Sequence, residues 1–244
     1  MNLKQLEAIS LQAWPALQET IYDGWMLRFS EGYTKRANSI NSLHPSTLPV
    51  VEKVSHCEQI YKDRRLPPIF RITPFSSPSD LDSYLEAQGY QKIDPTLVLT
   101  HTFVDLEIQR SPQGDLISAP LESWLDIFCG FLDEPIESHQ AHRKILQAIP
   151  SPKTFAILFL EDQPVACGVG SYVEKHLGLF DLLTHPDHRG KGHGTSLVLQ
   201  MLRWAQERDA QLAYLQVVEA NQTAMRLYRK LGFKRAYHYW YRRL

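Results

Sequence analysis

A glycine-rich segment at residues 189–195 limits the possible folds of this 244-residue chain more than any other part of its sequence. It lies between an apolar run at 177–184, which predicts a strand, and a stretch with apolar residues at helical spacing. Glycines at three alternate positions let backbone N–H groups approach an anion, and a helix start adds partial positive charge. Arg189 and Lys191 add full charges. The segment therefore predicts a site for a phosphate or pyrophosphate group.

Two common phosphate-binding motifs do not fit this segment. A P-loop needs a glycine five residues before its Gly-Lys pair, but His185 occupies that position and Gly192 follows Lys191. A dinucleotide fingerprint needs Gly-x-Gly-x-x-Gly within an early βαβ unit, whereas the glycines here stand at 190, 192 and 194. The phosphate ligand must therefore be bound by a different kind of loop.

The remaining sequence alternates predicted helices and strands, which indicates a mixed α/β fold. In the first half, helices are predicted at 3–17, 48–65 and 79–89, and strands at 25–29, 37–40, 69–72 and 96–103. In the second half, helices are predicted at 121–130, 138–149, after the glycine segment and after Asn221. Strands are predicted there at 155–160, 165–173, 177–184, 212–218 and 237–241. Residues 109–120 are polar and turn-rich, and form the best boundary between the halves.

Arg189, Gly192 and Gly194 form the pattern Arg-x-x-Gly-x-Gly. This pattern resembles the acetyl-CoA-binding signature of the GNAT family, the Gcn5-related N-acetyltransferases. Residues 182–187 look like that family's fourth strand and its exit turn, and residues 215–233 look like its fifth strand and the following helix. The resemblance covers roughly residues 116–244. The alternative interpretation is a glycine-rich turn that only joins a strand to a helix.

The resemblance implies an α/β fold whose mixed, mostly antiparallel central sheet is flanked by helices. It also implies an enzyme with acetyl-CoA as co-substrate. Such an N-acetyltransferase transfers the acetyl group to a primary amine of a small-molecule or protein acceptor, by direct attack of the amine on the thioester. The alternative, from another functional class, is a catalytically weak module that binds acyl-CoA or a partner. The sequence identifies neither the acceptor nor the oligomeric state.

The resemblance further assigns residues to the site. Leu183 and Thr184 match the strand end that pairs with the pantetheine arm of CoA. Asn221 matches an asparagine beside that arm, and its alternative role is a helix cap alone. Tyr228 matches the general acid that protonates the CoA thiolate, and its alternative role is that of a core tyrosine. The backbone amides expected at the CoA pyrophosphate are those of Arg189, Gly190, Lys191, Gly192, His193, Gly194 and Thr195.

The general base is where this chain departs from the family pattern. Some members carry a glutamate at the position of Gly178, and neither Gly178 nor Phe180 on the same strand face can accept a proton. Asp181 is near, but in a regular strand it points to the other face unless a bulge re-aims it. Glu219, just after the fifth strand, is a second weak candidate. A water chain or an amine that arrives deprotonated would also suffice.

Other titratable clusters favour structural roles. His139 and His142 are three residues apart, as are His185 and His188, and we expect all four at the surface with no metal bound. Cys167 lies in an apolar strand and is expected to be a small buried thiol. The three cysteines are far apart and form no Cys-x-x-Cys pair, which indicates a reducing compartment. A C-terminal basic cluster is expected in solvent: Lys230, Lys234, Arg235, Arg242 and Arg243.

Charge and hydropathy exclude several partners. Lys and Arg number 26 against 27 Asp and Glu, so the net charge of −1 provides no global basic field for nucleic acid or anionic lipid. The densest apolar run, at 155–160, is far shorter than the roughly 20 residues of a membrane helix. The first residues lack the apolar core of a secretory signal. We expect no nucleic-acid or membrane partner, and a cytoplasmic location.

The first half resembles a degenerate GNAT-like unit, as in tandem members of the family. Residues 84–90 echo residues 227–233, since both end a short helix at a glycine followed by an aromatic residue. Aligning the two glycines places Leu85 opposite Tyr228, and no glycine-rich loop occurs before residue 116. We therefore expect a degenerate domain at 1–108 and an acetyl-CoA-binding domain at 116–244. We expect the first domain to form one wall of the acceptor pocket. For four of its polar residues, exposed positions at an edge are favoured over positions that face the pocket: Arg28, Tyr33, Arg36 and Asn38.

Overall fold

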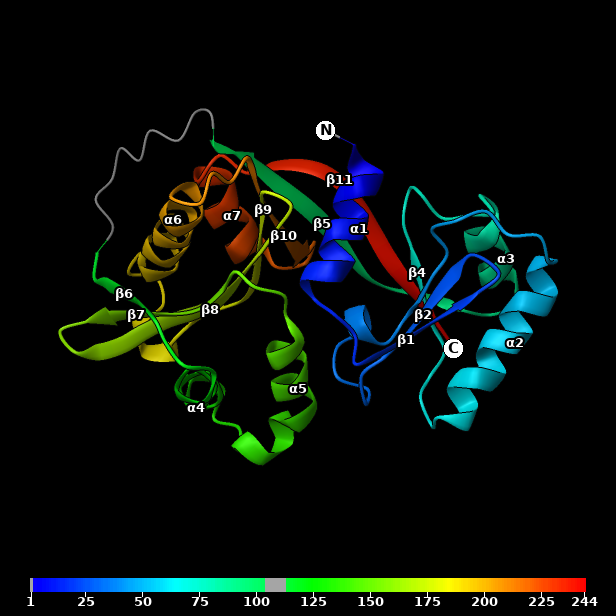
Figure 1. Cartoon of the computed structure of the whole chain (residues 1–244), viewed down its shortest axis with the longest axis horizontal. Coiled ribbons are helices and arrows are strands. Elements are labelled where there is room, and N and C mark those ends of the chain that lie inside the picture. Colours follow the sequence, from blue (N-terminus) through cyan, green and yellow to red (C-terminus); the bar gives the residue numbers. More distant parts are fainter. Residues whose placement is uncertain (1, 104–112) are drawn as a thin grey trace.

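A computed structural model describes residues 2–103 and 113–244 of the chain. Its centre is one 11-stranded sheet in the order β1-β2-β3-β4-β11-β5-β10-β9-β8-β7-β6 (Figure 1). Only the β3–β4 and β9–β10 neighbours are parallel. The expected mixed, mostly antiparallel sheet flanked by helices is confirmed.

The strands follow apolar or β-branched runs, and the helices follow residues at a spacing near 3.6. The strands are β1 Gln18–Tyr22, β2 Trp25–Phe29, β3 Ile40–Asn41, β4 Ile69–Ile72, β5 Gln91–Thr102, β6 Asp115–Ser118, β7 Lys153–Leu160, β8 Gln163–Val173, β9 His176–Thr184, β10 Leu212–Val218 and β11 Lys234–Arg243. The α-helices are α1 Leu3–Ala13, α2 Val50–Asp63, α3 Leu81–Ala87, α4 Leu121–Leu132, α5 Gln140–Ala148, α6 His193–Gln206 and α7 Gln222–Lys230. Among the 3-10 turns are η1 Lys35–Ala37, η3 Ile136–His139 and η4 Pro186–His188. Each helix is too short or too polar to span a lipid bilayer in the part of the chain described.

The two halves of the chain exchange their last strands. β5 belongs to the first half but pairs with β10 of the second, and β11 at the C-terminus pairs with β4 of the first half. β5 and β11 also pair with each other, so Figure 1 shows them running together across the centre of the molecule. Because these pairings join residues far apart in sequence, neither part of the sheet is complete without a strand from the other.

Helices cover the second half of the sheet on both faces. One core cluster joins α1, α4 and α5 to inward side chains such as Phe155 and Val169. A second joins α6 and α7 to neighbouring strand residues such as Ala156 and Leu158. Since successive side chains of a strand point to opposite faces, these two clusters lie on opposite sides of the sheet. The first half packs a third cluster around α2 and α3.

Most predicted elements are present, with some differences. The predicted helix at 3–17 ends at Ala13, and the predicted helix at 138–149 is the turn η3 followed by α5. The strand predicted at 37–40 is reduced to β3, Ile40–Asn41, after the turn η1. Strands β1 and β6 were not predicted. The proposed boundary between 1–108 and 116–244 lies largely at residues outside the described part of the chain, and that division stays a prediction.

Candidate active site

A fork between two parallel strands forms the centre of the candidate site. β9 and β10 pair from His176 and Leu212 as far as Leu179 and Leu215, and then separate. Beyond the fork β9 stays paired only with β8, and β10 only with β5, within the described residues. Leu183 and Thr184 therefore lie where β9 has one free backbone edge. That edge is open to an extended ligand.

The glycine-rich loop follows directly after the fork. Gly190 and Gly192 have φ of +77° and +91°, and a Cβ at either would meet open space. Gly192 is the N-cap of α6, and its carbonyl accepts from the amides of Thr195 at 3.0 Å and Ser196 at 3.1 Å. The backbone N–H groups of residues 190–194 have no hydrogen-bond partner in the described chain. This row of free donors at a helix N-terminus suits an anion.

The charges beside the loop have the sign that an anion requires. Arg189 and Lys191 are exposed, and Arg189 Nε donates to the Thr184 carbonyl at 3.4 Å. His193, the first residue of α6, is instead 3% exposed, and neither of its ring nitrogens has a partner among the described residues. Burial lowers the pKa of His193, so its imidazole is neutral at pH 7.

Helix α7 packs against the loop. A Cβ at Gly194 would lie 3.1 Å from Leu227 Cδ1 and 3.3 Å from Thr184 Oγ1, which shows how closely α7, the loop and β9 meet. Asn221 Oδ1 accepts from the amide of Ala224 at 3.1 Å, so the predicted helix cap is present. The cap fixes the first turn of α7 beside the end of β10.

Tyr228 lies on the buried face of α7. Its side chain is 9% exposed and its ring centroid lies 5.9 Å from that of Phe233. Burial raises the pKa of Tyr228 to about 12. The phenol is therefore protonated at neutral pH and can donate a hydrogen bond or a proton to a developing thiolate.

The position at which some family members carry a glutamate cannot hold a side chain here. A Cβ at Gly178 would lie 2.6 Å from both Phe180 Cε2 and the Tyr214 hydroxyl. Phe180 and Tyr214 therefore fill the space that a carboxylate would need. The Tyr214 hydroxyl is buried without a partner in the described chain. A base must come from another residue.

Asp181 is turned toward the same face by a bulge. The register of β8 and β9 shifts between the pairs Cys167–Leu183 and Val169–Phe180, and Asp181 has φ +47°. The bulge overrides the alternation that would send Asp181 to the opposite face. Its Oδ2 lies 2.8 Å from His142 Nε2 of α5, within hydrogen-bond distance. Glu219, the other candidate, is exposed.

Side chains of the first half reach this face of the sheet. Tyr33 stacks on His142 with ring centroids 4.6 Å apart. The Arg36 guanidinium lies 5.4 Å from the centroid of Phe180 and 5.9 Å from that of Trp14, and it has no acidic partner among the described residues. The positions of Tyr33 and Arg36 support the expectation that the first half forms one wall of the acceptor pocket.

Two other polar residues of the first half have structural roles. Arg28 is fully buried; it donates to the carbonyls of Leu11 and Trp14 and pairs with Glu19. Asn38 is also buried, and its side-chain oxygen accepts from backbone amides of the preceding loop. The expectation of exposed edge positions was wrong for both.

Three further expectations need correction. His139 and His142 are not at the surface but 4% and 0% exposed. His142, Ile145, Leu146 and Ile149 occupy the spacing of one helix face, and this pattern could have indicated burial. Arg242 of the basic cluster is also buried, at 4%, between Asp82 and Glu86. Cys57, Cys129 and Cys167 are free and buried, as expected for Cys167.

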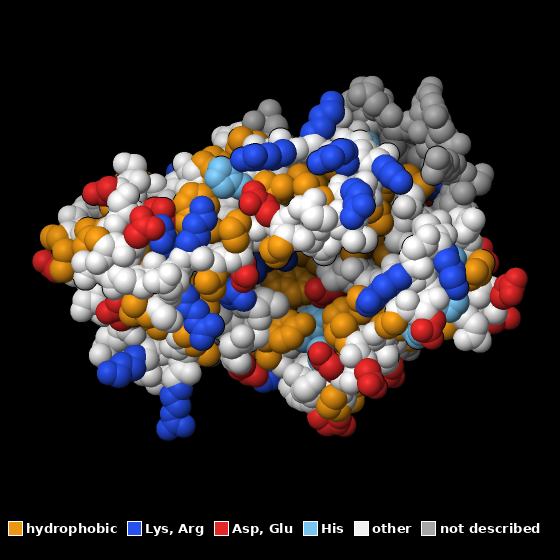
Figure 2. Space-filling model, turned by 180° about the vertical axis from the view of Figure 1, so that it is seen from behind, with side chains coloured by type: hydrophobic (Ala, Val, Ile, Leu, Met, Phe, Trp, Pro, Cys, Tyr) orange, Lys and Arg blue, Asp and Glu red, His pale blue; other side chains and the backbone are white. Residues whose placement is uncertain are grey.

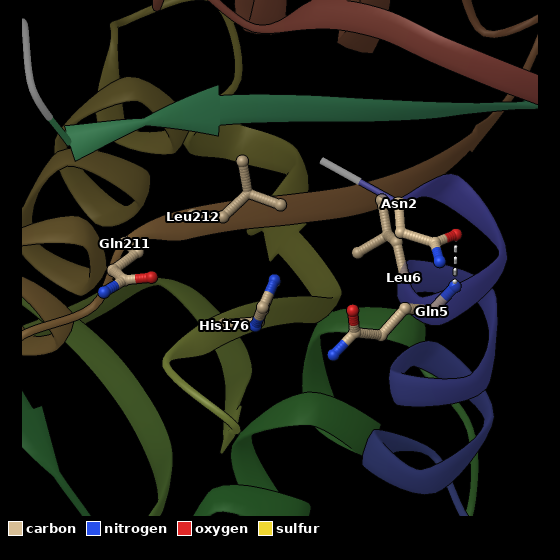
Figure 3. A pocket seen from close by; sticks show the side chains of 6 residues that line it. All are labelled: Asn2, Gln5, Leu6, His176, Gln211 and Leu212. Atoms are coloured by element: carbon tan, nitrogen blue, oxygen red, sulfur yellow. Dashed lines mark hydrogen bonds between the residues drawn. The ribbon is translucent and has the colours of Figure 1, made fainter.

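The surface of the protein has two hollows. Figure 2 shows the first near the centre of the face in view, with hydrophobic, acidic and histidine side chains at its edges and Lys and Arg side chains above it. Figure 3 shows a small pocket at the opposite ends of β9 and β10, lined by Asn2, Gln5, Leu6, His176, Gln211 and Leu212. His176 and Thr184 lie eight residues apart, or roughly 26 Å at ~3.3 Å per residue. The pocket is therefore remote from the loop.

Comparisons with known proteins agree with this geometry. Residues 1–242 match the family model described as "Probable histone acetyltransferase Rv0428c C-terminal". The chain is 28% identical over 245 residues to "Uncharacterized N-acetyltransferase YobR" of Bacillus subtilis (strain 168), with 99% of this chain and 98% of that protein covered. A GCN5-related N-acetyltransferase from Kribbella flavida superposes with a TM-score of 0.74 at 16% identity, over 98% of this chain and 94% of that one. A tandem GNAT protein from the clavulanic acid biosynthesis pathway gives 0.58 at 14% identity, over 77% and 67%.

Proposed function

Since the chain belongs to the GNAT family of N-acetyltransferases, we propose that it transfers the acetyl group of acetyl-CoA to a primary amine of a small-molecule or protein acceptor. The observation that carries this proposal is the row of N–H groups at residues 190–194, at the start of α6 and beside the strand fork, which have no hydrogen-bond partner among the described residues. These donors, with Arg189 and Lys191, match the charge and shape of a pyrophosphate. The proposed setting is the cytoplasm.

The proposed CoA site extends from the loop into the fork. The backbone amides of residues 190–194 hold the pyrophosphate, whereas those of Arg189 and Thr195, expected in the same role, donate to the carbonyls of Pro186 and Gly192. The free edge at Leu183 and Thr184 pairs with the amides of the pantetheine arm. Asn221 lies beside that arm while it caps α7. This path leads the thioester along the fork toward the face occupied by Phe180, Asp181 and the side chains of the first half.

The proposed chemistry is direct transfer. The acceptor nitrogen attacks the thioester carbon, a C–N bond forms, and the C–S bond breaks. Tyr228 donates a proton to the departing thiolate and regains one from water, and Asp181 takes the proton that the attacking amine loses. Holding the amine against the thioester supplies much of the rate by proximity, so no covalent enzyme intermediate is required.

The CoA site is tested by thermal unfolding with and without acetyl-CoA. A ligand that binds only the folded protein stabilises it by about 2.7 kcal/mol at a hundredfold excess over its Kd. Gly192→Asp is expected to abolish this shift because it places a carboxylate on the anion site. Gly89→Asp is the matched control, since Gly89 has φ +90° against +91° for Gly192 but lies after α3. No shift for the wild-type protein would favour the interaction module.

Turnover is tested by thiol release with a panel of amino acids, polyamines, aminoglycosides and peptides with free N-termini. Tyr228→Phe is expected to lower kcat by roughly 10²–10⁴ and to keep the acetyl-CoA shift. A binding module would release no thiol with any amine. A Tyr228→Phe variant with wild-type kcat would remove Tyr228 from the mechanism.

A further inference from the structure

We propose that Asp181, His142, His139 and Glu134 form a relay that carries the proton of the acceptor amine from the active site to the protein surface. The inference rests on the proposed acetyl transfer, because that reaction releases the proton. The sequence pattern paired His139 with His142 but linked neither to Asp181 or Glu134. The structure brings them together from β9, α5, η3 and the segment before η3.

The groups form one continuous chain of polar atoms. His142 Nε2 lies 2.8 Å from Asp181 Oδ2, and His139 Nε2 lies 2.7 Å from Glu134 Oε2. The two Nδ1 atoms are 3.4 Å apart, at the outer edge of the hydrogen-bond range. His142 is fully buried and His139 is 4% exposed, whereas the Asp181 and Glu134 side chains are 22% and 51% exposed. Two buried rings thus join an inner carboxylate to an outer one.

Aromatic packing fixes the orientation of the inner ring. Tyr33 stacks on His142 at an interplanar angle of 20°, while Trp124 and Phe128 meet it edge-on with centroids 6.1 and 5.2 Å away. A closely packed interior holds a side chain in one rotamer. Each ring nitrogen of His142 therefore faces one fixed partner, as a relay requires.

The number of available protons determines what the chain can do. A hydrogen is needed between each ring and its carboxylate, and another between the two Nδ1 atoms. Two neutral imidazoles supply only two N–H groups, so at least one of these positions lacks its hydrogen in every tautomer. A third proton fills all of them and is shared by the rings. The pair can therefore take up one proton beside Asp181 and release one beside Glu134.

The proton balance of the reaction matches this capacity. An ammonium acceptor and acetyl-CoA give an amide, CoA thiol and one free proton. The ammonium passes this proton to Asp181, which frees the nitrogen lone pair for attack. Asp181 passes this proton to the unprotonated Nε2 of His142, and the proton on His142 Nδ1 moves to His139 Nδ1. Glu134 then takes the proton from His139 Nε2 and releases it to water. After the product leaves, Asp181 releases a proton to water and Glu134 takes one up, so the rings return to their starting tautomers before the next turnover.

Other titratable groups around the rings do not compete for the proton. Burial, followed by the charges of Asp181 and Glu134, raises the pKa of Tyr33, so its hydroxyl stays protonated. Burial likewise raises the pKa of the Cys129 and Cys167 thiols, which pack against the same region from α4 and β8. The two carboxylates and the two imidazoles are thus the groups of this cluster through which a proton can pass.

A purely structural network would show the same contacts, so the test needs a conservative variant. Glu134→Gln keeps an oxygen that accepts from His139 Nε2 but cannot take up a proton. Glu137→Gln is the matched control, because Glu137 is exposed in the same η3 turn. Both changes remove one surface negative charge and neither empties the core, so folding is preserved.

The first measurement is the ring ¹⁵N shifts of the whole protein between about pH 5 and 9, and it needs no acceptor. We expect the ring shifts of His139 and His142 to change together, because their Nδ1 atoms are in contact, with both rings altered in Glu134→Gln and neither altered in Glu137→Gln. Rings that titrate independently, or keep single neutral tautomers across this range, would overturn the relay.

The second measurement is kcat against pH, with acetyl-CoA and the fastest amine of the panel. In Glu134→Gln we expect kcat to fall roughly tenfold near pH 7, below the ~10²–10⁴ contribution of a direct acid–base group. KM for acetyl-CoA stays unchanged, and the loss shrinks at higher pH as more of the amine arrives deprotonated. Wild-type thiol release with an unchanged Glu134→Gln profile overturns the relay alone. No thiol release from the wild-type protein overturns the proposed function, and the relay with it.

Discussion

The substitution Gly178→Ala tests whether the active-site face leaves room for a side chain where some relatives carry glutamate. A Cβ there would lie 2.6 Å from Phe180 and from the Tyr214 hydroxyl, closer than real Cβ contacts allow. Overpacking of this kind costs about 1–3 kcal/mol, whereas the reduced freedom of the unfolded chain returns about 0.4–1 kcal/mol. We expect a net loss of about 0.5–2 kcal/mol, measured by urea denaturation.

A matched glycine separates the steric cost from the entropy gain. Gly130 lies in α4, and a Cβ there meets nothing within 4 Å, so Gly130→Ala is expected to stabilise by about 0.4–1 kcal/mol. The difference between the variants, about 1–3 kcal/mol, corresponds to roughly 2–12 °C in Tm for a chain of this length. Tyr214→Phe removes one of the clashing atoms and should recover part of the loss. If Gly178→Ala were as stable as Gly130→Ala, a carboxylate could fit at 178 and the case for Asp181 would fail.

Charged and titratable groups away from the reacting atoms give further expectations. Arg242→Met should lower the free energy of unfolding by about 1.5–3 kcal/mol, measured by urea denaturation, because it removes hydrogen bonds to acidic side chains of α3. Arg243 is exposed, so Arg243→Met should change the same free energy by less than about 0.5 kcal/mol. Glu7→Gln should cost about 3–5 kcal/mol in the same assay, because the fully buried Arg71 would lose its counter-charge. Burial lowers the pKa of His193 in the folded protein, so the unfolded protein binds a proton at this imidazole more readily. The free energy of unfolding should therefore fall as the pH drops below about 6.5, and it should fall less steeply in His193→Phe. Urea denaturation at pH 7.5 and 5.5 measures that difference.

Local sequence patterns predicted most of the elements. The strands Trp25–Phe29, Ile69–Ile72 and Leu212–Val218 were predicted to the residue, because each is a short apolar run bounded by turn signals. β1, Gln18–Tyr22, was missed because it is an exposed edge strand, whose polar side chains follow no burial pattern. The exchange of β5 and β11 could not be predicted either. It depends on pairings between distant residues that local patterns do not encode.

The candidate site was likewise predicted from the sequence only in part. The glycine loop was found because one short segment carries its backbone geometry and its charges, and neighbouring residues suffice to describe it. The contact between Asp181 and His142 was missed because it needs a bulge in β9 and the docking of α5 onto the sheet. A positive φ at an aspartate leaves no clear mark in a single sequence. The assignments carried over to Tyr228 and Asn221 stay predictions.

The strand exchange explains how the first half of the chain contributes to the candidate site. The fork needs β10 to separate from β9 while it is held on its other edge, and the strand on that edge is β5 of the first half. The same half places Tyr33 on His142 and Arg36 over Phe180. The first half therefore fixes both the fork geometry and the orientation of the His142 ring. Because both depend on contacts between the halves, the candidate site is built by the two halves together.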